Sequence, residues 1–398
     1  MIKIDSLDHY GRGISKLDGK IVFIENALPN EVVEIKILKE KKKYIEGNVS
    51  NYIKTSEERV NVDCPYYNSC GGCNIMHLSY DNQLKFKQDK LENIVHKYLD
   101  KDFRINNIVG CKNDKFYRNK VTFQVKENVG FCNNITYDVI NIDNCLISDK
   151  LINNSIKYLK KLNLKEINKI TCRTGSNELM VIIETTNPNL DITQVKEIAN
   201  SIYLKVNDKF IHIYGNKNIY EKLDDFKYII SPDSFFQVNI DTCKKLYRKI
   251  KEYVGSNKNI IDLYCGTGSI GIFVSNENNV IGIEINESAI IDAKINKEIN
   301  NIDNIKFICG DSGKKLKNLN FKPDIIIVDP PRSGLNKETI ENILNFDAQE
   351  IIYVSCDPMT FVRDLNILKN SYKIKEITPF DMFPNTYHVE SLAHLIKM

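Results

Sequence analysis

The 398-residue sequence lacks the features that mark several protein classes. No stretch approaches the roughly 18–20 consecutive apolar residues that a membrane-spanning helix needs. Residues 1–5 have neither the basic start nor the apolar segment of a secretory signal peptide. No segment is rich in proline, glycine and serine, as flexible linkers are. We therefore expect a folded, cytoplasmic protein that does not contact the membrane.

Charge of one sign is also scarce. The 55 Lys and Arg residues nearly balance the 52 Asp and Glu residues, and the formal net charge is +3. A small basic excess falls before residue 226, which is compatible with nucleic-acid contact but does not establish it. No obligate protein partner is indicated.

The eleven cysteines are an odd number, which in a cytoplasmic chain argues against a disulfide framework. Metal ligation or thiolate chemistry is then the leading interpretation for cysteines that lie in clusters or motifs. The isolated cysteines are expected to be small buried apolar residues: Cys111, Cys132, Cys172, Cys243 and Cys309.

Three regions differ in pattern. Residues 1–54 alternate short apolar runs with turns, which predicts a small β-barrel with a basic tip at Lys39 and residues 41–43. Residues 55–225 are mixed α+β, with helical patterns near 80–99, 148–162 and 191–203. From 226 to 398, strand patterns alternate with helix-length segments, which predicts an α/β domain with a parallel sheet covered on both faces. Its last two strands have no helix between them and suit an antiparallel hairpin at the sheet edge.

A glycine-rich loop follows the first strand of the third region. Gly266, Gly268 and Gly271 form G-x-G-x-x-G between a strand and a helix, where the backbone can approach a nucleotide-like ligand closely. The next strand ends at Glu284, an acid placed to accept bonds from ribose hydroxyls. A nicotinamide dinucleotide and S-adenosylmethionine both fit these features.

The later strands separate the two ligands. The third strand ends at Asp311, placed to bond an adenine amino group, and the fourth at Asp329-Pro330-Pro331-Arg332, which hydride transfer does not require. No Gly-Lys-[Ser/Thr] phosphate loop is present. The pattern predicts a seven-stranded, Rossmann-like class I methyltransferase domain. Arg332 stands where enzymes that methylate exocyclic amines usually place an aromatic residue, which disfavours that reaction.

The fifth strand ends at Cys356, beside the expected methyl donor. C5 of uracil is too weak a nucleophile to attack a sulfonium methyl until a thiolate adds to C6, so a cysteine is what this reaction needs. The C5 proton must then leave, which requires a base. Glu390, at the start of the last strand, is the preferred base, and His388 is its neighbour and rival.

Together these residues resemble the RNA 5-methyluridine methyltransferases, which modify bacterial transfer RNA and large-subunit ribosomal RNA. The resemblance covers nearly the whole chain. It implies that Cys356 is the nucleophile, that Glu390 is the base and that residues 1–54 form a TRAM domain, an RNA-binding β-barrel. Asp357 departs from the Asn frequent in the family, and a carboxylate directed at the sulfur would oppose thiolate formation. The motifs that carry the resemblance include Ser231-Pro232, Phe235-Phe236-Gln237-Val238-Asn239, Asp262-Leu263-Tyr264-Cys265-Gly266 and Ser355-Cys356-Asp357-Pro358, and the implied contacts to S-adenosylmethionine are Gln237, Tyr264, Glu284 and Asp329.

A cysteine cluster lies at the start of the central region. Cys64, Cys70 and Cys73 stand in a C-x5-C-x2-C arrangement, and Cys145 is the best candidate for a fourth ligand. The resemblance implies a 4Fe-4S cluster, as in the branch that modifies 23S ribosomal RNA, and this favours ribosomal over transfer RNA as substrate. Zinc on the same four thiolates is the rival, because thiolate number alone does not separate the two.

Three other functions compete with methylation of ribosomal RNA. A transfer RNA uridine-C5 methyltransferase shares the catalytic motifs. An RNA 5-methylcytosine methyltransferase would carry a second cysteine after the fourth-strand prolines, where Arg332 stands. A non-catalytic iron–sulfur RNA-binding protein would not need the intact Cys356 and Glu390.

Overall fold

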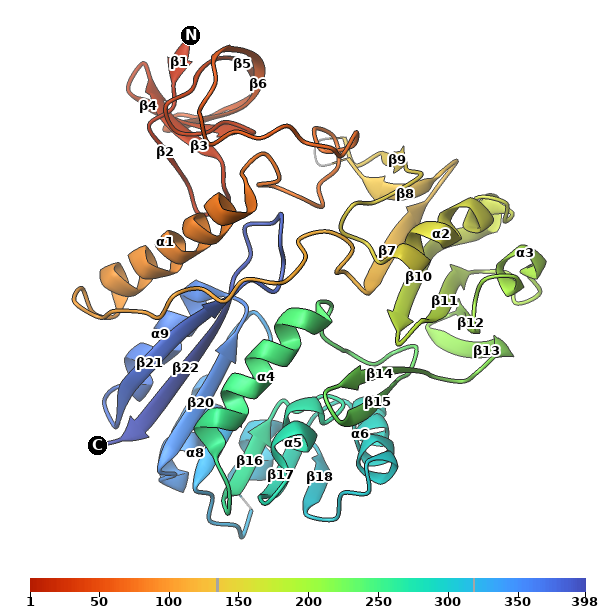
Figure 1. Cartoon of the computed structure of the whole chain (residues 1–398), viewed down its shortest axis with the longest axis vertical. Coiled ribbons are helices and arrows are strands. Elements are labelled where there is room, and N and C mark those ends of the chain that lie inside the picture. Colours follow the sequence, from red (N-terminus) through yellow and green to blue (C-terminus); the bar gives the residue numbers. More distant parts are fainter. Residues whose placement is uncertain (134–135, 318) are drawn as a thin grey trace.

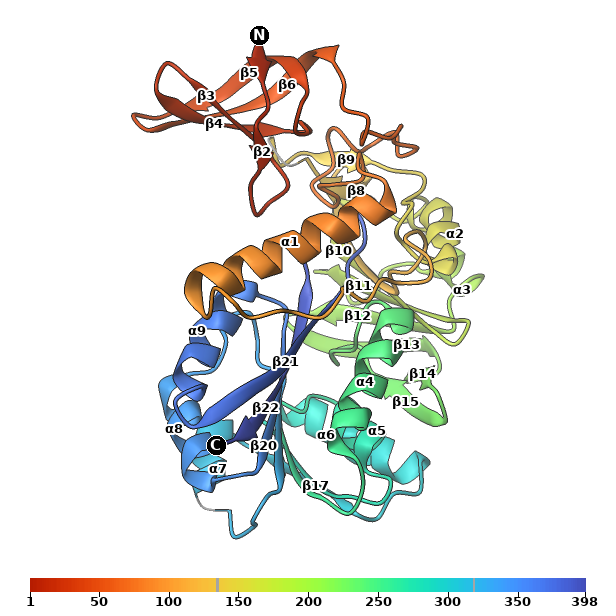
Figure 2. The same cartoon turned by 60° about the vertical axis from the view of Figure 1, so that its left-hand side comes forward.

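The computed structural model describes residues 1–133, 136–317 and 319–398. Figures 1 and 2 show a small β lobe at the N-terminal end, a central sheet flanked by short helices, and a larger sheet with helices on both faces at the C-terminal end. The long helix α1 (Tyr80–Tyr98) runs below the N-terminal lobe, along the C-terminal part.

The N-terminal lobe is a six-stranded sheet in the order β1-β5-β6-β4-β3-β2. Alternate residues such as Val22 and Ile24 are buried, because successive side chains of a strand point to opposite faces. The expected basic tip is confirmed, since the exposed residues 41–43 join β5 to β6. The strands are β1 (Ile2–Lys3), β2 (Ser6–Leu7), β3 (Gly13–Leu17), β4 (Lys20–Glu25), β5 (Val32–Glu40) and β6 (Tyr44–Lys54).

The central part is a seven-stranded sheet in the order β13-β12-β11-β10-β7-β8-β9, antiparallel except between β11 and β12. Its strands are β7 (Lys120–Val125), β8 (Val129–Cys132), β9 (Val139–Asn141), β10 (Ile167–Gly175), β11 (Glu178–Thr185), β12 (Ser201–Val206) and β13 (Lys209–Gly215). Two helices, α2 (Lys150–Leu159) and α3 (Thr193–Lys196), and the 3-10 turn η1 (Leu164–Glu166) pack on one face. A two-stranded ribbon of β14 (Ile219–Leu223) and β15 (Phe226–Ile230) leads to the C-terminal part.

Helices are confirmed at two of the three expected places in the central part. The pattern over 191–203 was wrong beyond its first turn: α3 ends at Lys196, and β12 begins at Ser201. Residues 201–206 lie between β11 and β13 and pair with both. Hydrogen bonding in the sheet therefore overrides the local helical pattern.

The C-terminal part is a seven-stranded sheet in the order β18-β17-β16-β19-β20-β22-β21, in which only β22 runs against its neighbours. The predicted doubly wound sheet with a terminal hairpin is confirmed. The strands are β16 (Asn259–Leu263), β17 (Asn279–Glu284), β18 (Ile305–Cys309), β19 (Ile325–Val328), β20 (Glu350–Ser355), β21 (Tyr372–Phe380) and β22 (Glu390–Lys397). The helices are α4 (Ile240–Val254), α5 (Ser269–Val274), α6 (Glu287–Ile299), α7 (Ser312–Lys317), α8 (Lys337–Phe346) and α9 (Pro358–Leu368).

Both faces of this sheet are buried, as parallel sheets require. Ile260 and Ile327 pack with α4, α5 and α6, whereas Ile261 and Ile326 pack on the opposite side with α8 and α9. Helix α1 joins this second core through Leu91 and its neighbours Ile94, Val95 and Leu99. The three larger sheets match the three expected regions, and the boundaries at 54/55 and 225/226 remain predictions.

Candidate active site

The loop after β16 is shaped for close approach of a ligand. Tyr264, Gly266 and Gly268 all have positive φ, at 61°, 53° and 76°. A Cβ on Gly268 would lie 2.5 Å from Cζ of Phe307, so only glycine fits there. No atom lies within 4 Å of the position that a Cβ on Gly266 would take. The loop is therefore packed against Phe307 at Gly268 and has free space next to Gly266.

Acidic and polar side chains surround this open loop. Glu284, at the end of β17, accepts the Gly266 N–H at Oε2 (3.1 Å) and the Asn286 N–H at Oε1 (2.8 Å). Asp311 follows β18 and accepts the Lys314 N–H at Oδ1 (3.0 Å). The Tyr264 hydroxyl lies 3.4 Å from that of Thr339. These groups follow three neighbouring strands and so occupy one edge of the sheet.

Gln237 precedes α4 and is buried, and its carbonyl accepts a hydrogen bond from Asn119 Nδ2 (3.0 Å). Asp329 follows β19, and burial raises the pKa of its carboxyl to about 7. A carboxyl with that pKa changes its protonation state near neutral pH.

Cys356 follows β20, and burial is the main reason that its pKa is raised to about 11. The negative charges of Glu390 and Asp329 also raise the pKa, whereas Arg332 lowers it by its positive charge and a hydrogen bond. Without substrate, Cys356 is therefore a thiol at neutral pH, and Arg332 is the group that favours its ionisation.

Glu390 begins β22 and is 3% exposed. Burial raises its pKa well above the ordinary value, the charge of Asp329 raises it further, and Arg332 opposes both. Burial also lowers the pKa of His388 to about 4, and Arg332 contributes to this shift. His388 is neutral near pH 7, and its ring lies 4.3 Å from that of Tyr387.

Asp357 does not oppose the nucleophile in the way that its sequence position suggested. Its Oδ1 accepts the N–H groups of Met359 (3.0 Å) and Thr360 (2.9 Å). Asp357 is thus the N-cap of α9, and its carboxylate satisfies the helix terminus.

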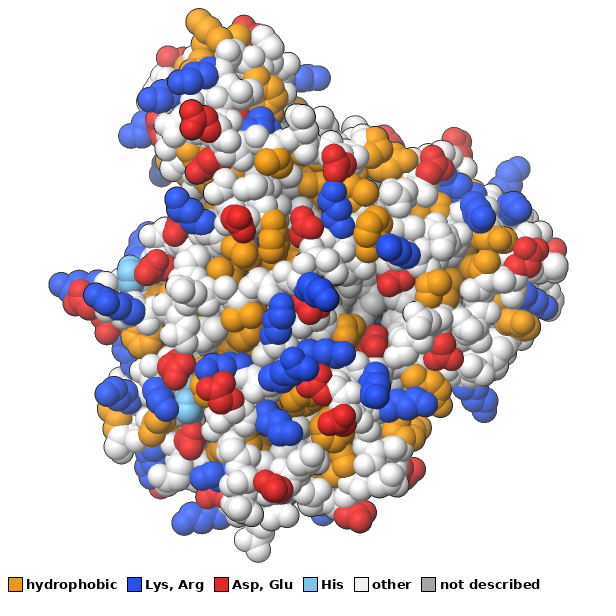
Figure 3. All heavy atoms as spheres, in the orientation of Figure 1, with side chains coloured by type: hydrophobic (Ala, Val, Ile, Leu, Met, Phe, Trp, Pro, Cys, Tyr) orange, Lys and Arg blue, Asp and Glu red, His pale blue; other side chains and the backbone are white. Residues whose placement is uncertain are grey.

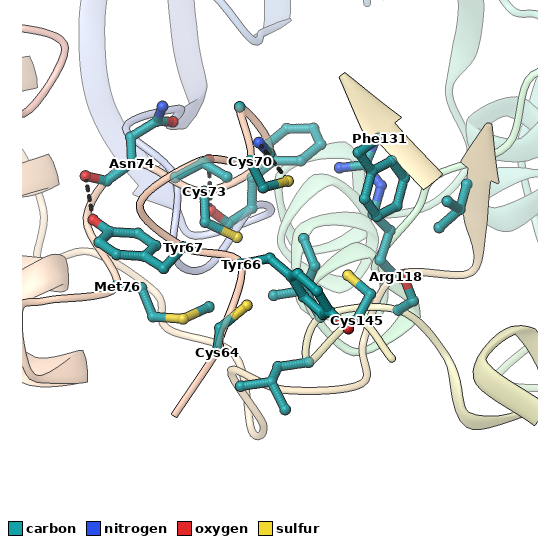
Figure 4. A pocket seen from close by; sticks show the side chains of 18 of the residues that line it. Cys64, Tyr66, Tyr67, Cys70, Cys73, Asn74, Met76, Arg118, Phe131 and Cys145 are labelled. Atoms are coloured by element: carbon teal, nitrogen blue, oxygen red, sulfur yellow. Dashed lines mark hydrogen bonds between the residues drawn. The ribbon is translucent and has the colours of Figure 1, made fainter. Parts of the chain in front are cut away.

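The four clustered cysteines line one cavity of about 500 Å³. In Figure 4 the sulfur atoms of Cys64, Cys70, Cys73 and Cys145 surround a common hollow, and all four thiols are free. Burial raises the pKa of Cys70 to about 11, and Cys64 and Cys145 are near enough to raise it further. The same cavity is lined by Arg332, Phe383, Thr386, Tyr387 and His388, so it reaches the segment that precedes Glu390.

Metal ligation is not shown by this arrangement. Across residues 1–133, 136–317 and 319–398, no group of three or more His, Cys, Asp or Glu side chains could hold a metal ion as placed. Of the five cysteines expected to be isolated and buried, three are buried, but Cys132 and Cys309 are exposed. Both lie at the ends of strands, where side chains reach solvent.

Comparison with known proteins identifies the family. A model described as tRNA (uracil-5-)-methyltransferase matches residues 194–398, and the TRAM domain model matches residues 1–49. An uncharacterized RNA methyltransferase of Staphylococcus aureus strain MRSA252 is 36% identical, with 97% of this chain and 95% of that protein covered. The chain belongs to the tRNA (uracil-5-)-methyltransferase family. An uncharacterized RNA methyltransferase of Clostridium acetobutylicum is 35% identical, with 100% and 96% covered.

A solved structure of this family has the same fold over the whole chain. It is the Pyrococcus abyssi tRNA (uracil-54, C5)-methyltransferase in complex with S-adenosyl-L-homocysteine. The TM-score is 0.84 at 31% identity, and each chain is covered to 100%. The predicted class I methyltransferase domain, the TRAM domain and the assignment as an S-adenosylmethionine-dependent RNA methyltransferase are thereby confirmed.

Within the uracil-5-methyltransferase fold, the predicted site residues fall into two groups. Tyr264, Gly266, Glu284, Asp311 and Asp329 lie at or just after the ends of strands, at one edge of the sheet. Cys356 and Glu390 form the second group: the charge of Glu390 raises the pKa of Cys356, and Asp329 and Arg332 act on both. Their roles stay predictions. Sequence reasoning missed the part of Arg332 beside the thiol, although its place directly after the strand-four prolines was a usable signal.

The surface charge of the methyltransferase does not distinguish ribosomal RNA from transfer RNA as the partner. In the view of Figure 3, basic and acidic side chains are intermixed over all three parts, in keeping with the near balance of charge. In the part of the chain that the structure describes, no helix has the length and apolar character to cross a membrane.

Proposed function

We propose that the protein methylates C5 of a uridine in RNA through a covalent bond between Cys356 Sγ and C6, with Glu390 removing the C5 proton. One observation carries the proposal: Cys356, Asp329 and Glu390 meet at one edge of the sheet, with Arg332 close to the thiol, beside the open loop at Gly266.

The open loop and its acidic rim fit the methyl donor. S-adenosylmethionine supplies an electrophilic methyl group when bound. We expect Glu284 to accept hydrogen bonds from the ribose hydroxyls and Asp311 to accept one from the adenine amino group. The remaining candidate contacts to the methyl donor are Gln237, Tyr264, Gly266 and Asp329.

The chain's own groups account for the proton transfers. Cys356 must first lose its proton, and the Asp329 carboxylate, whose pKa burial raises to about 7, receives it, so that Glu390 is left free to take the C5 proton. Arg332 stabilises the thiolate that remains. Sγ then bonds to C6, the C5–C6 π electrons become an enolate, and C5 takes the methyl group as the donor's C–S bond breaks. Glu390 removes the C5 proton, the C5–C6 double bond re-forms, and the thiolate leaves.

A 4Fe-4S cluster at Cys64, Cys70, Cys73 and Cys145 is part of the proposal. Four free thiols around one hollow supply the donor set that such a cluster needs. Zinc on the same four thiolates is the alternative, because four thiolates can also hold a single zinc ion. The thiols would anchor the central part, and none of them takes a direct chemical part in methyl transfer.

The proposed substrate is 23S ribosomal RNA, on the strength of the cysteine pattern. Transfer RNA is the second candidate, because the Pyrococcus abyssi protein is named a tRNA (uracil-54, C5)-methyltransferase. Mapping 5-methyluridine in total RNA from a deletion strain separates the two. Loss from ribosomal RNA supports the first, and loss from transfer RNA alone supports the second. The cytosine alternative predicts loss of 5-methylcytosine instead.

A further inference from the structure

The segment between β21 and β22, residues 381–389, is unusually enclosed. Connections between strands ordinarily run over the surface, but every residue of this one is buried or half-buried. It contains His388 and ends directly before Glu390. Its backbone polar groups must therefore find partners within the protein.

Separate elements supply those partners. From α1, Lys87 Nζ donates to the Phe383 carbonyl (2.9 Å) and pairs with the Asp381 carboxylate, and both side chains of that ion pair are fully buried. Lys90 Nζ donates to the Tyr387 carbonyl (2.9 Å). From the start of α4, the Thr242 hydroxyl donates to the Asp381 carbonyl (3.0 Å).

Asn385 is the most heavily bonded residue of the segment. Its φ is 67° and it is 2% exposed. Its N–H donates to Gln83 Oε1 (2.8 Å), its Oδ1 accepts from Gln83 Nε2 (3.1 Å), and its Nδ2 donates to the Asp114 carbonyl (2.8 Å). Its carbonyl accepts the N–H groups of Asn74 (2.9 Å) and Ile75 (3.2 Å).

The last two bonds come from the cysteine loop, which we define as residues 64–75. Asn74 directly follows Cys73, and its carbonyl accepts the Tyr67 hydroxyl (2.8 Å), as Figure 4 shows. Tyr67 lies between Cys64 and Cys70 in the chain. Asn74 therefore makes two connections: its carbonyl bonds Tyr67 within the cysteine loop, and its N–H bonds Asn385 in the segment that precedes Glu390.

We propose that Asn385 is a positioning residue that couples the cysteine loop to Glu390, so that filling the thiol site sets where the Glu390 carboxyl lies. The inference rests on the proposed function for the role of Glu390 and of the four cysteines. The coupling runs through two backbone bonds from Asn74 and Ile75 and through the side-chain bonds that hold Asn385 in its left-handed conformation.

The first test is a mutant cycle on C5-proton loss, measured as tritium release from RNA labelled at C5. Asn385→Gly keeps the left-handed backbone accessible and removes the side-chain bonds. Because small misplacements of a catalytic group cost large factors in rate, we expect proton loss to slow roughly tenfold or more. Cys73→Ser should slow it similarly, and the double variant should lie within about threefold of the slower single variant, because coupled residues are not additive.

Gln83→Met is the second variant, since it removes both Gln83 bonds and leaves Asn385 itself intact. Asn106→Gly is the matched control: its amide bonds Glu376 and Thr378 on β21, away from the cysteine loop, and it should leave tritium release unchanged. S-adenosylmethionine affinity should be unchanged in every variant. If the effects of Asn385→Gly and Cys73→Ser multiply, the coupling does not exist.

Hydrogen exchange supplies a readout that does not depend on activity. Loading the anaerobic protein with ferrous iron and sulfide should slow amide exchange over residues 385–390, and Asn385→Gly should abolish this effect. Because coupling is reciprocal, Asn385→Gly should also bind iron less tightly, measured by equilibrium competition with a chelator. Unchanged exchange on loading overturns the proposal. If Glu390 were not the base, the exchange effect would persist while no variant altered tritium release, so the two failures are distinguishable.

Discussion

Replacing Glu390 with Gln tests the catalytic assignment most sharply. The amide is nearly the same size and cannot accept a proton, so thiolate addition and methyl transfer remain possible while elimination is blocked. Enzyme and RNA should accumulate as a methylated adduct, since Sγ stays bonded to C6 until the C5 proton leaves. A positioned base contributes about 10²- to 10⁴-fold, which corresponds to roughly 2.7–5.5 kcal/mol of barrier at 1.36 kcal/mol per tenfold.

The same substitution has a second, signed consequence at Cys356. The charge of Glu390 raises the pKa of the thiol, and Gln carries none. The Cys356 pKa should therefore be lower in Glu390→Gln than in the unaltered enzyme. Because the adduct needs the thiolate, the adduct in Glu390→Gln should form at a pH below that at which the thiol of the unaltered enzyme ionises. If the charge of Asp329, and not that of Glu390, were the main charge that raises the Cys356 pKa, this pKa would be the same in Glu390→Gln and in the unaltered enzyme.

The assay is denaturing electrophoresis of enzyme mixed with S-adenosylmethionine and RNA, with a labelled methyl group to show that the trapped base is methylated. Glu376→Gln, on the edge strand β21, is the matched control and should trap nothing. Because a base must be unstacked to be reached, loop RNA should form more adduct than duplex. Slow turnover without adduct would assign the base to His388 or water, and complete loss without adduct would make Glu390 a group that positions uracil.

Three further results are expected. Cys356→Ala should abolish methylation while S-adenosylmethionine still binds, and even a few percent of normal turnover would refute the nucleophile assignment. Arg332→Gln should raise the Cys356 pKa above about 11, seen as an upward shift in the pH profile of thiol alkylation; an unchanged profile would exclude Arg332 as the stabilising charge. Protein purified without air should be brown and hold about four iron and four sulfide per chain. A colourless protein with one zinc ion per chain would show that the four cysteines bind zinc and not an iron–sulfur cluster.

The buried ion pair between α1 and the 381–389 segment yields a stability prediction. Lys87→Met leaves the Asp381 carboxylate buried without a partner and should cost about 3–5 kcal/mol of unfolding free energy. The double change Lys87→Met with Asp381→Leu should recover much of that loss, because no charge remains uncompensated. Chemical denaturation measures both. A single variant within about 0.5 kcal/mol of the unaltered protein would show that the pair is not desolvated as the structure indicates.

Much of the methyltransferase domain was predictable from the sequence because each of its strands can be recognised from a short stretch of residues. Each strand of the parallel sheet is an apolar run that ends in a polar motif, and the carboxyl ends of parallel strands meet at one edge. Gly266, Glu284, Asp311, Asp329 and Cys356 could thus be placed near one another without coordinates. The terminal hairpin followed from the missing helix before β22.

Other features depend on contacts that no local pattern encodes. The strand β12 replaced an expected helix because β11 and β13 supply its hydrogen bonds. Helix α1 has a recognisable helical pattern, yet only the folded chain shows that it packs on the methyltransferase sheet and holds the 381–389 segment.

The electrostatics of the site were likewise decided by tertiary structure. The residue types at Cys356, Asp329 and Glu390 were evident in the sequence, but burial in the folded chain raises the pKa of each, and charges from other strands raise those of Cys356 and Glu390 further. Desolvation and Coulomb interactions depend on distance in space and not on separation along the chain. For that reason the sequence could nominate the nucleophile and the base, and only the fold could show that the charge of Arg332 acts on both.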